Sequence, residues 1–194
     1  MKPTFFEWLK AIKNFILEIP IEISAFIVAP FLYFFVDKET GHLPKWLSWY
    51  DEPNYGAWGD KGWKQSHFQE PKNKTWWAIT RWYWRNRING YQTKVTGIPL
   101  SEVKVTSIEV QGNKFATINL GTSCLVRLET FDGKKYFGFF YTKVWCKKFY
   151  LRIYIGHKLM EFQSANDVLN ADKKYVEPVF SIHPFRKVSS LSLD

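Results

Sequence analysis

The side chains that could do acid and base chemistry are three carboxylates in a turn-rich stretch. Asp51, Glu52 and Asp60 are close enough in sequence to act as an acid and a base. No catalytic histidine, serine or glycine motif accompanies them, and carboxylates in such loops are usually solvated. The sequence also has no phosphate-binding glycine loop, nucleophile elbow or metal-binding helix motif. We therefore predict a protein that is not an enzyme, with no catalytic residues and no cofactor.

The cysteines and histidines do not form a metal-binding pattern. Cys124 and Cys146 match no zinc spacing. They fit a reducing compartment, and one disulfide between adjacent strands is the alternative. The four histidines are isolated from one another: His42, His67, His157 and His183. We predict no metal site.

Binding of anions is indicated by basic residues interleaved with aromatic ones between residues 143 and 154. Cations can bind phosphates while rings stack on bases, as in proteins that bind single-stranded nucleic acid. The candidate anion-binding residues are Lys143, Lys147, Lys148 and Arg152. Alternation on a strand gives the other interpretation, with one core face and one solvated face. That interpretation puts Phe149, Leu151 and Ile153 in the core and Lys148, Tyr150, Arg152 and Tyr154 in solvent.

The positive charge of the chain is unevenly distributed. Lysine and arginine together number 27 against 18 acidic residues, which gives a net charge of +9. Residues 1–36 hold three lysines and three glutamates, so the whole excess belongs to residues 37–194. That part of the chain should be attracted to anionic partners such as lipid headgroups or nucleic acid.

The N-terminal segment is strongly apolar. Thr4 and Glu7 have the spacing of a capping box, which predicts a helix start. We expect an amphipathic helix that ends near Pro20 and that either packs on its own domain or lies in a membrane interface. Residues 15–36 could then reach about 33 Å as a helix, the thickness of a bilayer core. Glu18 and Glu22 interrupt this segment, so a buried core helix or a re-entrant segment is the alternative.

We favour membrane insertion of this segment, followed by tryptophans at the wet edge of the bilayer. The predicted membrane-anchoring residues are Phe26, Ile27, Val28, Phe31, Leu32, Phe34, Phe35, Trp46 and Trp49.

A tryptophan-rich joint follows, with residues 37–74 irregular and a helix from Thr75 to Asn89 that stops at Gly90. A strand is the alternative for the helix, because its residues are rich in aromatic and β-branched types. We predict that its aromatic residues form a structural clamp between a sheet and the loop bearing Trp46 and Trp49, with the arginines held by Asp51, Asp60 or backbone carbonyls. An open aromatic binding pocket is the alternative. The predicted clamp consists of Trp76, Trp77, Tyr83, Trp84, Arg85 and Arg87.

The sequence pattern changes after Gly97, where short runs of residues that favour β-strands alternate with turns. Asp132-Gly133 is the strongest hairpin signal, because both residues tolerate positive φ. The predicted strands are residues 102–110, 115–120, 124–131, 134–145, 148–155 and 158–162, with a turn at Gly156-His157 and a helical excursion at 164–174. The fold class is therefore α+β: N-terminal hydrophobic helices, a Trp-rich joint and helix, and an antiparallel β-meander or partly closed small barrel. The expected domains are residues 1–36, 37–97 and 98–194.

Several motifs recur in the order that a known group of proteins shows. They are Leu43-Pro44-x-Trp46-Leu47-x-Trp49-x-Asp51, Gly59-Asp60, Arg81-Trp82-x-Trp84-Arg85-Asn86-Arg87, Gly156-His157-Lys158-Leu159 and Ser181-Ile182-His183-Pro184-Phe185. This order resembles a group of small, uncharacterised tailed-bacteriophage and prophage proteins over most of the chain. His157 and His183 stand where that group has Trp and Asn. The resemblance implies a phage origin but no mechanism.

These features lead to three functional hypotheses. The first is a non-enzymatic, phage-encoded accessory protein that is bound to the host inner membrane and presents a basic β domain. The second is a structural or assembly component of the virion, whose hydrophobic segment is buried against neighbouring subunits or copies in a homo-oligomer. The third is a membrane-tethered domain that binds nucleic acid.

Overall fold

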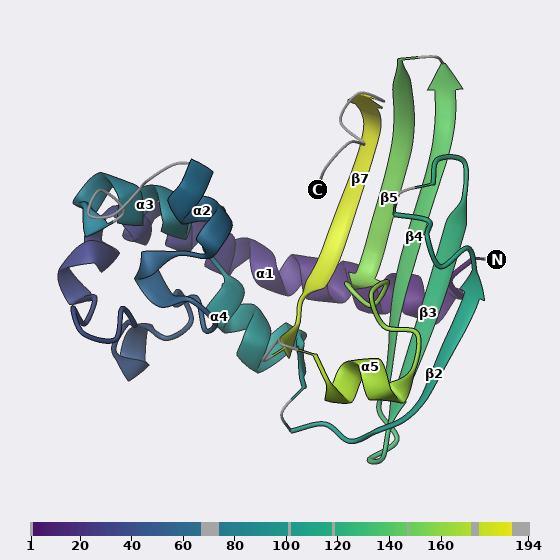
Figure 1. Cartoon of the computed structure of the whole chain (residues 1–194), viewed down its shortest axis with the longest axis horizontal. Coiled ribbons are helices and arrows are strands. Elements are labelled where there is room, and N and C mark those ends of the chain that lie inside the picture. The colour runs from purple at the N-terminus through teal and green to yellow at the C-terminus, as the bar shows by residue number, and fades with distance from the viewer. Residues whose placement is uncertain are drawn as a thin grey trace. The chain divides into compact units, whose positions relative to one another are not determined.

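The computed structural model describes residues 2–66, 74–100, 102–117, 119–146, 148–171 and 175–187, and Figure 1 shows the path of the chain. The chain divides into two compact units. The sheet unit combines Met1–Phe15 with Ile98–Asp194, and the helical unit is Ile16–Gly97. The boundary at Ile98 is the one expected from sequence. The expected boundary after residue 36 is absent, because the apolar N-terminal segment is divided between the two units.

Helix α1, Phe5–Leu32, is 28 residues long. It begins with the expected capping box, in which the Thr4 amide donates to Glu7 Oε2 at 2.7 Å and the Glu7 amide donates to Thr4 Oγ1 at 3.3 Å. The predicted end near Pro20 is wrong, because the helix continues through Pro20 and Pro30 to a 3-10 turn at Tyr33–Phe35. A proline removes one backbone donor. The helix nevertheless runs through both prolines to Leu32.

The sheet unit is built on an open five-stranded antiparallel sheet in the order β2-β3-β4-β5-β7, whose strands lie side by side in Figure 1. A short ladder pairs β1 with β6. The predicted α+β class is confirmed, and the described strands do not close into a barrel. The elements are β1 (Ile98–Pro99), β2 (Val105–Gly112), β3 (Ser123–Thr130), β4 (Lys135–Cys146), β5 (Phe149–His157), α5 (Ala165–Leu169), β6 (Tyr175–Val176) and β7 (Pro178–Lys187).

Of the turns and strands predicted from local sequence in this sheet, one turn is present and two strands are not, within the described residues. The Asp132-Gly133 turn joins β3 to β4 as predicted, with φ of 75° at Gly133. The strand expected at residues 115–120 is wrong for the residues that the structure describes there: residues 114–117 form a turn, in which Asn113 Oδ1 accepts from the Phe115 amide at 2.9 Å. The strand expected at 158–162 is also wrong, because those residues form a loop and a turn.

The C-terminal end of the sheet differs most from expectation. Gly156 lies within β5 instead of in a turn, and its φ of 91° is one that glycine adopts without strain. Strand β7 was not predicted. It contains Pro184, which a central strand would not tolerate, but β7 is an edge strand and its register shifts between the β5 residues Tyr150 and Arg152.

Both faces of the sheet are covered. One face packs on Ala11 of α1, through Leu125, Phe137, Phe139 and Ile155. The other face packs against the loops and α5, through a core that includes Val126, Leu128, Phe140, Leu159 and Val168. The solvated face expected for β5 is therefore only partly present: Lys148 is exposed and Arg152 half-buried, but Tyr150 is buried and Tyr154 packs on the second core. Cys124 is a buried free thiol whose pKa is raised by that burial.

The helical unit packs short helices and loops against the rest of α1. Its core joins Ala29, Leu32 and Val36 to Leu43, Leu47 and Ala57 of the loop and to Ile79 and Tyr83 of α3. The described helices after α1 are 3-10 turns at Tyr33–Phe35, Lys45–Leu47 and Gly56–Trp58, helices α2 (Lys61–Ser66), α3 (Trp76–Arg85) and α4 (Asn89–Tyr91), and a π-helical turn at Gln92–Thr96.

Helix α3 is shorter than the predicted helix. Thr75 caps it by accepting from the Ala78 amide at 3.3 Å, and it ends at Arg85 instead of Asn89. The predicted stop at Gly90 is wrong, because Gly90 lies inside α4. A Cβ there would lie 2.1 Å from the carbonyl oxygen of Ser48, so the glycine allows the loop to approach.

Candidate membrane-binding surface

One face of α1 is buried within the helical unit. Ala25, Ala29 and Leu32 are each at most 1% exposed. Their spacing of four and three residues places them on one side of the helix, and Ala29 and Leu32 pack in a core with residues of the loop and of α3. The opposite side of α1 is therefore left for solvent or a partner.

That opposite side carries no charged residue between Ile16 and Phe35. We call it the apolar face, which consists of Ile16, Leu17, Ile19, Ile23, Phe26, Ile27, Phe31, Phe34 and Phe35, each between 38% and 71% exposed. A surface helix of a soluble protein normally directs polar side chains outward. Here the exposed side is the apolar one, and such a contiguous patch usually marks a binding surface.

The two glutamates of this segment are turned away from the apolar face. Glu18 is buried and accepts from the Thr96 hydroxyl at 2.7 Å. Glu22 is half-exposed and lies 3.6 Å from the guanidinium of Arg87. The two charges that interrupt the hydrophobic segment in sequence are therefore held by partners within the helical unit.

Two tryptophans of α3 bind backbone carbonyls of α1. Pro30 has no amide, so the carbonyl of Phe26 lacks its usual partner four residues later. Trp84 Nε1 donates to that carbonyl at 3.0 Å, and the Trp84 ring stacks on Phe26 with centroids 5.5 Å apart. Trp76 Nε1 donates to the carbonyl of Pro30 itself at 2.7 Å, near the end of the helix. These indole N–H groups are satisfied internally.

The exposed indole rings adjoin the apolar face. Trp77 lies between Trp76 and Trp84, with ring centroids 5.9 and 5.7 Å away. Trp46, which is 70% exposed, meets Phe35 edge-on at 5.3 Å. We call Trp46, Trp76, Trp77 and Trp84 the tryptophan rim.

Most of the predicted membrane-anchoring residues are exposed. Phe26, Ile27, Phe31, Phe34 and Phe35 belong to the apolar face. Trp46 is in the rim, while Trp49 is 46% exposed and meets Tyr91 edge-on. Val28 is half-buried against the core and Leu32 is 1% exposed. Assigning Leu32 to the membrane is wrong, because it lies on the side of α1 that packs on the unit's own core.

The predicted clamp has a different arrangement. Tyr83 is fully buried in the core, but Trp76 and Trp77 are 44% and 48% exposed, so they are not enclosed. Within the helical unit, Trp76 and Trp84 hold α1. The residue that prediction missed is Trp82, which is 1% exposed and donates from Nε1 to the Gly56 carbonyl at 2.8 Å.

Among the described residues, Arg85 and Arg87 do not show the predicted pairing with Asp51 or Asp60. Arg85 lies over the rings of Trp63 and Trp82, 5.7 and 6.0 Å from their centroids. Arg87 donates to the Trp84 carbonyl at 2.8 Å, which is the backbone alternative. These contacts place the arginine heads at indole faces and carbonyls rather than at the loop acids.

Asp51 and Glu52 are buried and bind their own loop. Asp51 Oδ2 lies 2.8 Å from His42 Nδ1, and Asp51 Oδ1 accepts from the Leu43 amide at 3.3 Å. The Tyr83 hydroxyl donates to the same oxygen at 3.5 Å. Burial, and then the charge of Asp51, raises the pKa of Tyr83 well above its ordinary value, so the hydroxyl stays a donor. These groups fix the loop against α3.

The predicted anion-binding residues are divided between the two faces of the sheet. Lys143 pairs with Leu151 across the strands, whereas Arg152 pairs with Thr142, so their side chains point to opposite faces. Lys148 is exposed in the turn before β5, and Lys147 lies outside the described residues. Within the described part of the chain, no group of three or more metal-ligating side chains gathers.

Comparisons with known proteins place the chain in a family. By length and composition the segment Phe5–Phe35 could cross a membrane, as core helices and signal sequences also could. No curated protein and no solved structure matches the chain. Residues 2–190 match the model of a family of unknown function, DUF7338. The phage origin expected from the motifs is not tested by this match and stays a prediction. Since the match covers nearly the whole chain, the protein belongs to the DUF7338 family.

Proposed function

We propose that this protein is a non-enzymatic, membrane-associated protein that binds lipid through the apolar face of α1 and the tryptophan rim. The observation that carries the proposal is the uncharged, exposed side of α1 from Ile16 to Phe35. Burial of apolar surface stabilises by about 25 cal/mol per Å². Removing this face from water would therefore supply the binding energy.

The rim supports lipid as the partner. Indole rings favour the boundary between headgroups and acyl chains, because one side of the ring is apolar and the N–H is polar. The N–H groups of Trp76 and Trp84 are already bonded to α1 carbonyls. These two rings can enter an apolar medium without leaving an unpaired donor, which would cost about 1–3 kcal/mol.

The burial pattern supports a helix that lies in the membrane interface over one that crosses the bilayer alone. A spanning helix needs lipid or apolar protein on every side, but Ala29 and Leu32 face a core that adjoins the polar loop of His42 and Asp51. An interfacial helix needs only one apolar side. The phage resemblance would make this surface the inner membrane of the host cell.

Flotation with vesicles tests the proposal. The full chain, diluted from a non-ionic detergent, should float with phosphatidylcholine vesicles. Replacing two residues of the apolar face, Ile27→Asp with Phe31→Asp, should lower the partition coefficient at least about 100-fold, since each large apolar side chain contributes about 1.5–3 kcal/mol.

Exposed apolar residues of the same unit outside the apolar face give the matched control. Tyr55 and Val95 are 53% and 51% exposed, and Tyr55→Asp with Val95→Asp should float like the wild type. Equal loss in both double variants would contradict the proposal. A wild type that stays in a discrete oligomer and does not float would instead favour the virion hypothesis, in which other copies cover the apolar face.

A further inference from the structure

Three adjacent strands of the sheet unit contain no acidic residue. Strands β4, β5 and β7 hold five lysines and arginines and no aspartate or glutamate. Lys148 adds a further exposed cation in the turn between β4 and β5. These three strands therefore carry an excess of positive charge, although Lys135 pairs with Glu129 of β3 at 3.7 Å, and such an excess attracts an anionic partner.

Aromatic side chains are exposed where these strands end. Trp145 is 56% exposed and Phe185 is 72% exposed, and their rings stack with centroids 6.1 Å apart. Phe149 meets Phe185 edge-on at 6.5 Å. We call these three residues the aromatic end of the sheet. Rings that stack in solvent offer a surface for further stacking rather than a core contact.

Cations and polar groups lie on the other face of the same strands. Strand pairing places Arg152 beside His183 and Tyr150 beside Arg186. Arg152 Nη2 lies 3.4 Å from Ser181 Oγ, while its buried Nε has no hydrogen-bond partner. A buried guanidinium N–H without an acceptor is costly, whereas Arg152 as a whole is half-buried.

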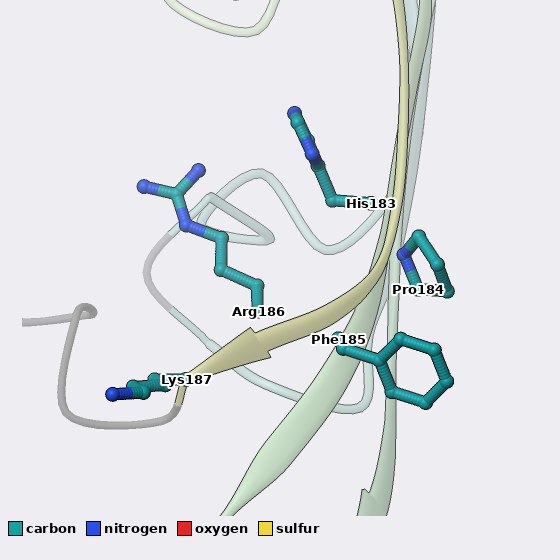
Figure 2. A pocket seen from close by; sticks show the side chains of 5 residues that line it. All are labelled: His183, Pro184, Phe185, Arg186 and Lys187. Atoms are coloured by element: carbon teal, nitrogen blue, oxygen red, sulfur yellow. The ribbon is translucent and has the colours of Figure 1, made fainter.

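At the C-terminal end of the edge strand β7, side chains from both faces of the strand line one hollow. A hollow of about 510 Å³ there is lined by His183, Pro184, Phe185, Arg186 and Lys187. Figure 2 shows His183 and Arg186 on one side of the strand and Pro184 and Phe185 on the other. A chain that crosses this edge would find rings on one side and cations on the other.

We infer that the aromatic end and the C-terminal part of β7 bind single-stranded nucleic acid. Bases stack on Phe185 and Trp145, and backbone phosphates lie against Arg152, His183 and Arg186. This combination of rings and cations is what sequence-tolerant single-strand binding requires. A lipid surface is the less favoured partner, because here the rings alternate with charges, whereas the apolar face has none.

Fluorescence anisotropy with a labelled oligothymidylate tests the inference on the full chain in a non-ionic detergent, which covers the apolar face. Phe185→Leu, which keeps apolar bulk without a ring, should raise Kd about 5- to 100-fold, the usual loss of one stacked base. Phe185→Tyr should restore binding to within about twofold, because it keeps the ring. Arg186→Gln should reduce the slope of log Kd against log salt by about 0.7, for one phosphate contact.

Phe131 provides the control, because it is equally aromatic, 81% exposed and lies in the β3–β4 turn. Phe131→Leu should leave Kd unchanged. The inference is overturned if the oligonucleotide does not bind, if Phe131→Leu weakens binding as much as Phe185→Leu, or if phosphatidylglycerol vesicles displace the oligonucleotide while Phe185→Leu has no effect. Flotation of the same variants with neutral vesicles should be unchanged, so failure here is distinguishable from failure of the membrane proposal.

Discussion

The helical unit and the sheet unit each expose aromatic rings, but in opposite surroundings. In the helical unit, the tryptophan rim adjoins an apolar face with no charge between Ile16 and Phe35. In the sheet unit, Trp145 and Phe185 sit on strands that carry cations and no acids. Both surfaces expose aromatic rings, so the charge of the neighbouring residues decides which partner each surface favours. Uncharged neighbours favour lipid, and cationic neighbours favour stacked bases joined by phosphates.

The two surfaces also differ in how their tryptophans are held. Trp76 and Trp84 donate to α1 carbonyls, so their orientation is fixed by hydrogen bonds that an apolar medium strengthens. Trp145 is positioned by ring stacking alone among the contacts that the described residues show. The first arrangement tolerates removal from water, while the second leaves the ring face open.

The largest loss of stability should come from replacing the buried Trp82 rather than an exposed tryptophan of the same helix. Trp82→Ala should cost about 3–5 kcal/mol of unfolding free energy, because the ring is 1% exposed and its N–H bonds to Gly56. Trp77→Ala, in the same helix but 48% exposed, should cost less than about 1 kcal/mol. Urea denaturation followed by circular dichroism gives both values.

Trp84 is half-buried, so we expect Trp84→Ala to lie between those two rather than at the 3–5 kcal/mol that a fully enclosed clamp implies. Equal costs for Trp77→Ala and Trp82→Ala would mean that the exposed rings are structural. The contrast between a folding core and a binding surface in the helical unit would then fail.

Sequence alone predicts the features that local chemistry fixes. The Thr4–Glu7 capping box and the Asp132-Gly133 turn depend on residues a few positions apart, and both are present. The α+β class follows from periodicity in the same way. Strand β7 escaped prediction because Pro184 argues against a strand unless the strand is known to be at an edge, which only the pairing of distant segments reveals.

The candidate surface is only partly predictable, for a related reason. Hydropathy identifies α1 as apolar but does not show which side packs on the protein, so Leu32 and Phe31 look alike in sequence although one is 1% and the other 59% exposed. The same holds for Trp82 and Trp84 in α3. Glu18 points away from the apolar face and accepts a hydrogen bond from Thr96, which is 78 residues away in sequence.

The next largest effect should be the difference in salt dependence between oligonucleotide binding and vesicle binding. Raising sodium chloride from about 50 to about 200 mM should weaken oligonucleotide binding on the order of 50-fold, if about four phosphates are contacted with a slope of about −0.7 each. Binding to neutral vesicles should change less than about twofold, because burial of the apolar face releases no counterions. Parallel titrations by anisotropy and flotation provide the comparison, and similar salt slopes for both ligands would remove the distinction drawn here.

The smallest effect concerns the hydrogen bond by which Trp84 fixes α1. If Trp84 Nε1 serves the Phe26 carbonyl because Pro30 cannot, then Trp84→Phe should cost about 1 kcal/mol in the wild type, the usual worth of one hydrogen bond. In a Pro30→Ala background the new amide can donate to the same carbonyl, so Trp84→Phe should cost a few tenths of a kcal/mol or less. A double-mutant cycle by urea denaturation isolates this coupling, whose expected size is about 1 kcal/mol. A coupling near zero would mean that stacking on Phe26, rather than the freed carbonyl, positions this ring of the rim. The ring would then depend on contact area for its place, as Trp145 does at the aromatic end of the sheet.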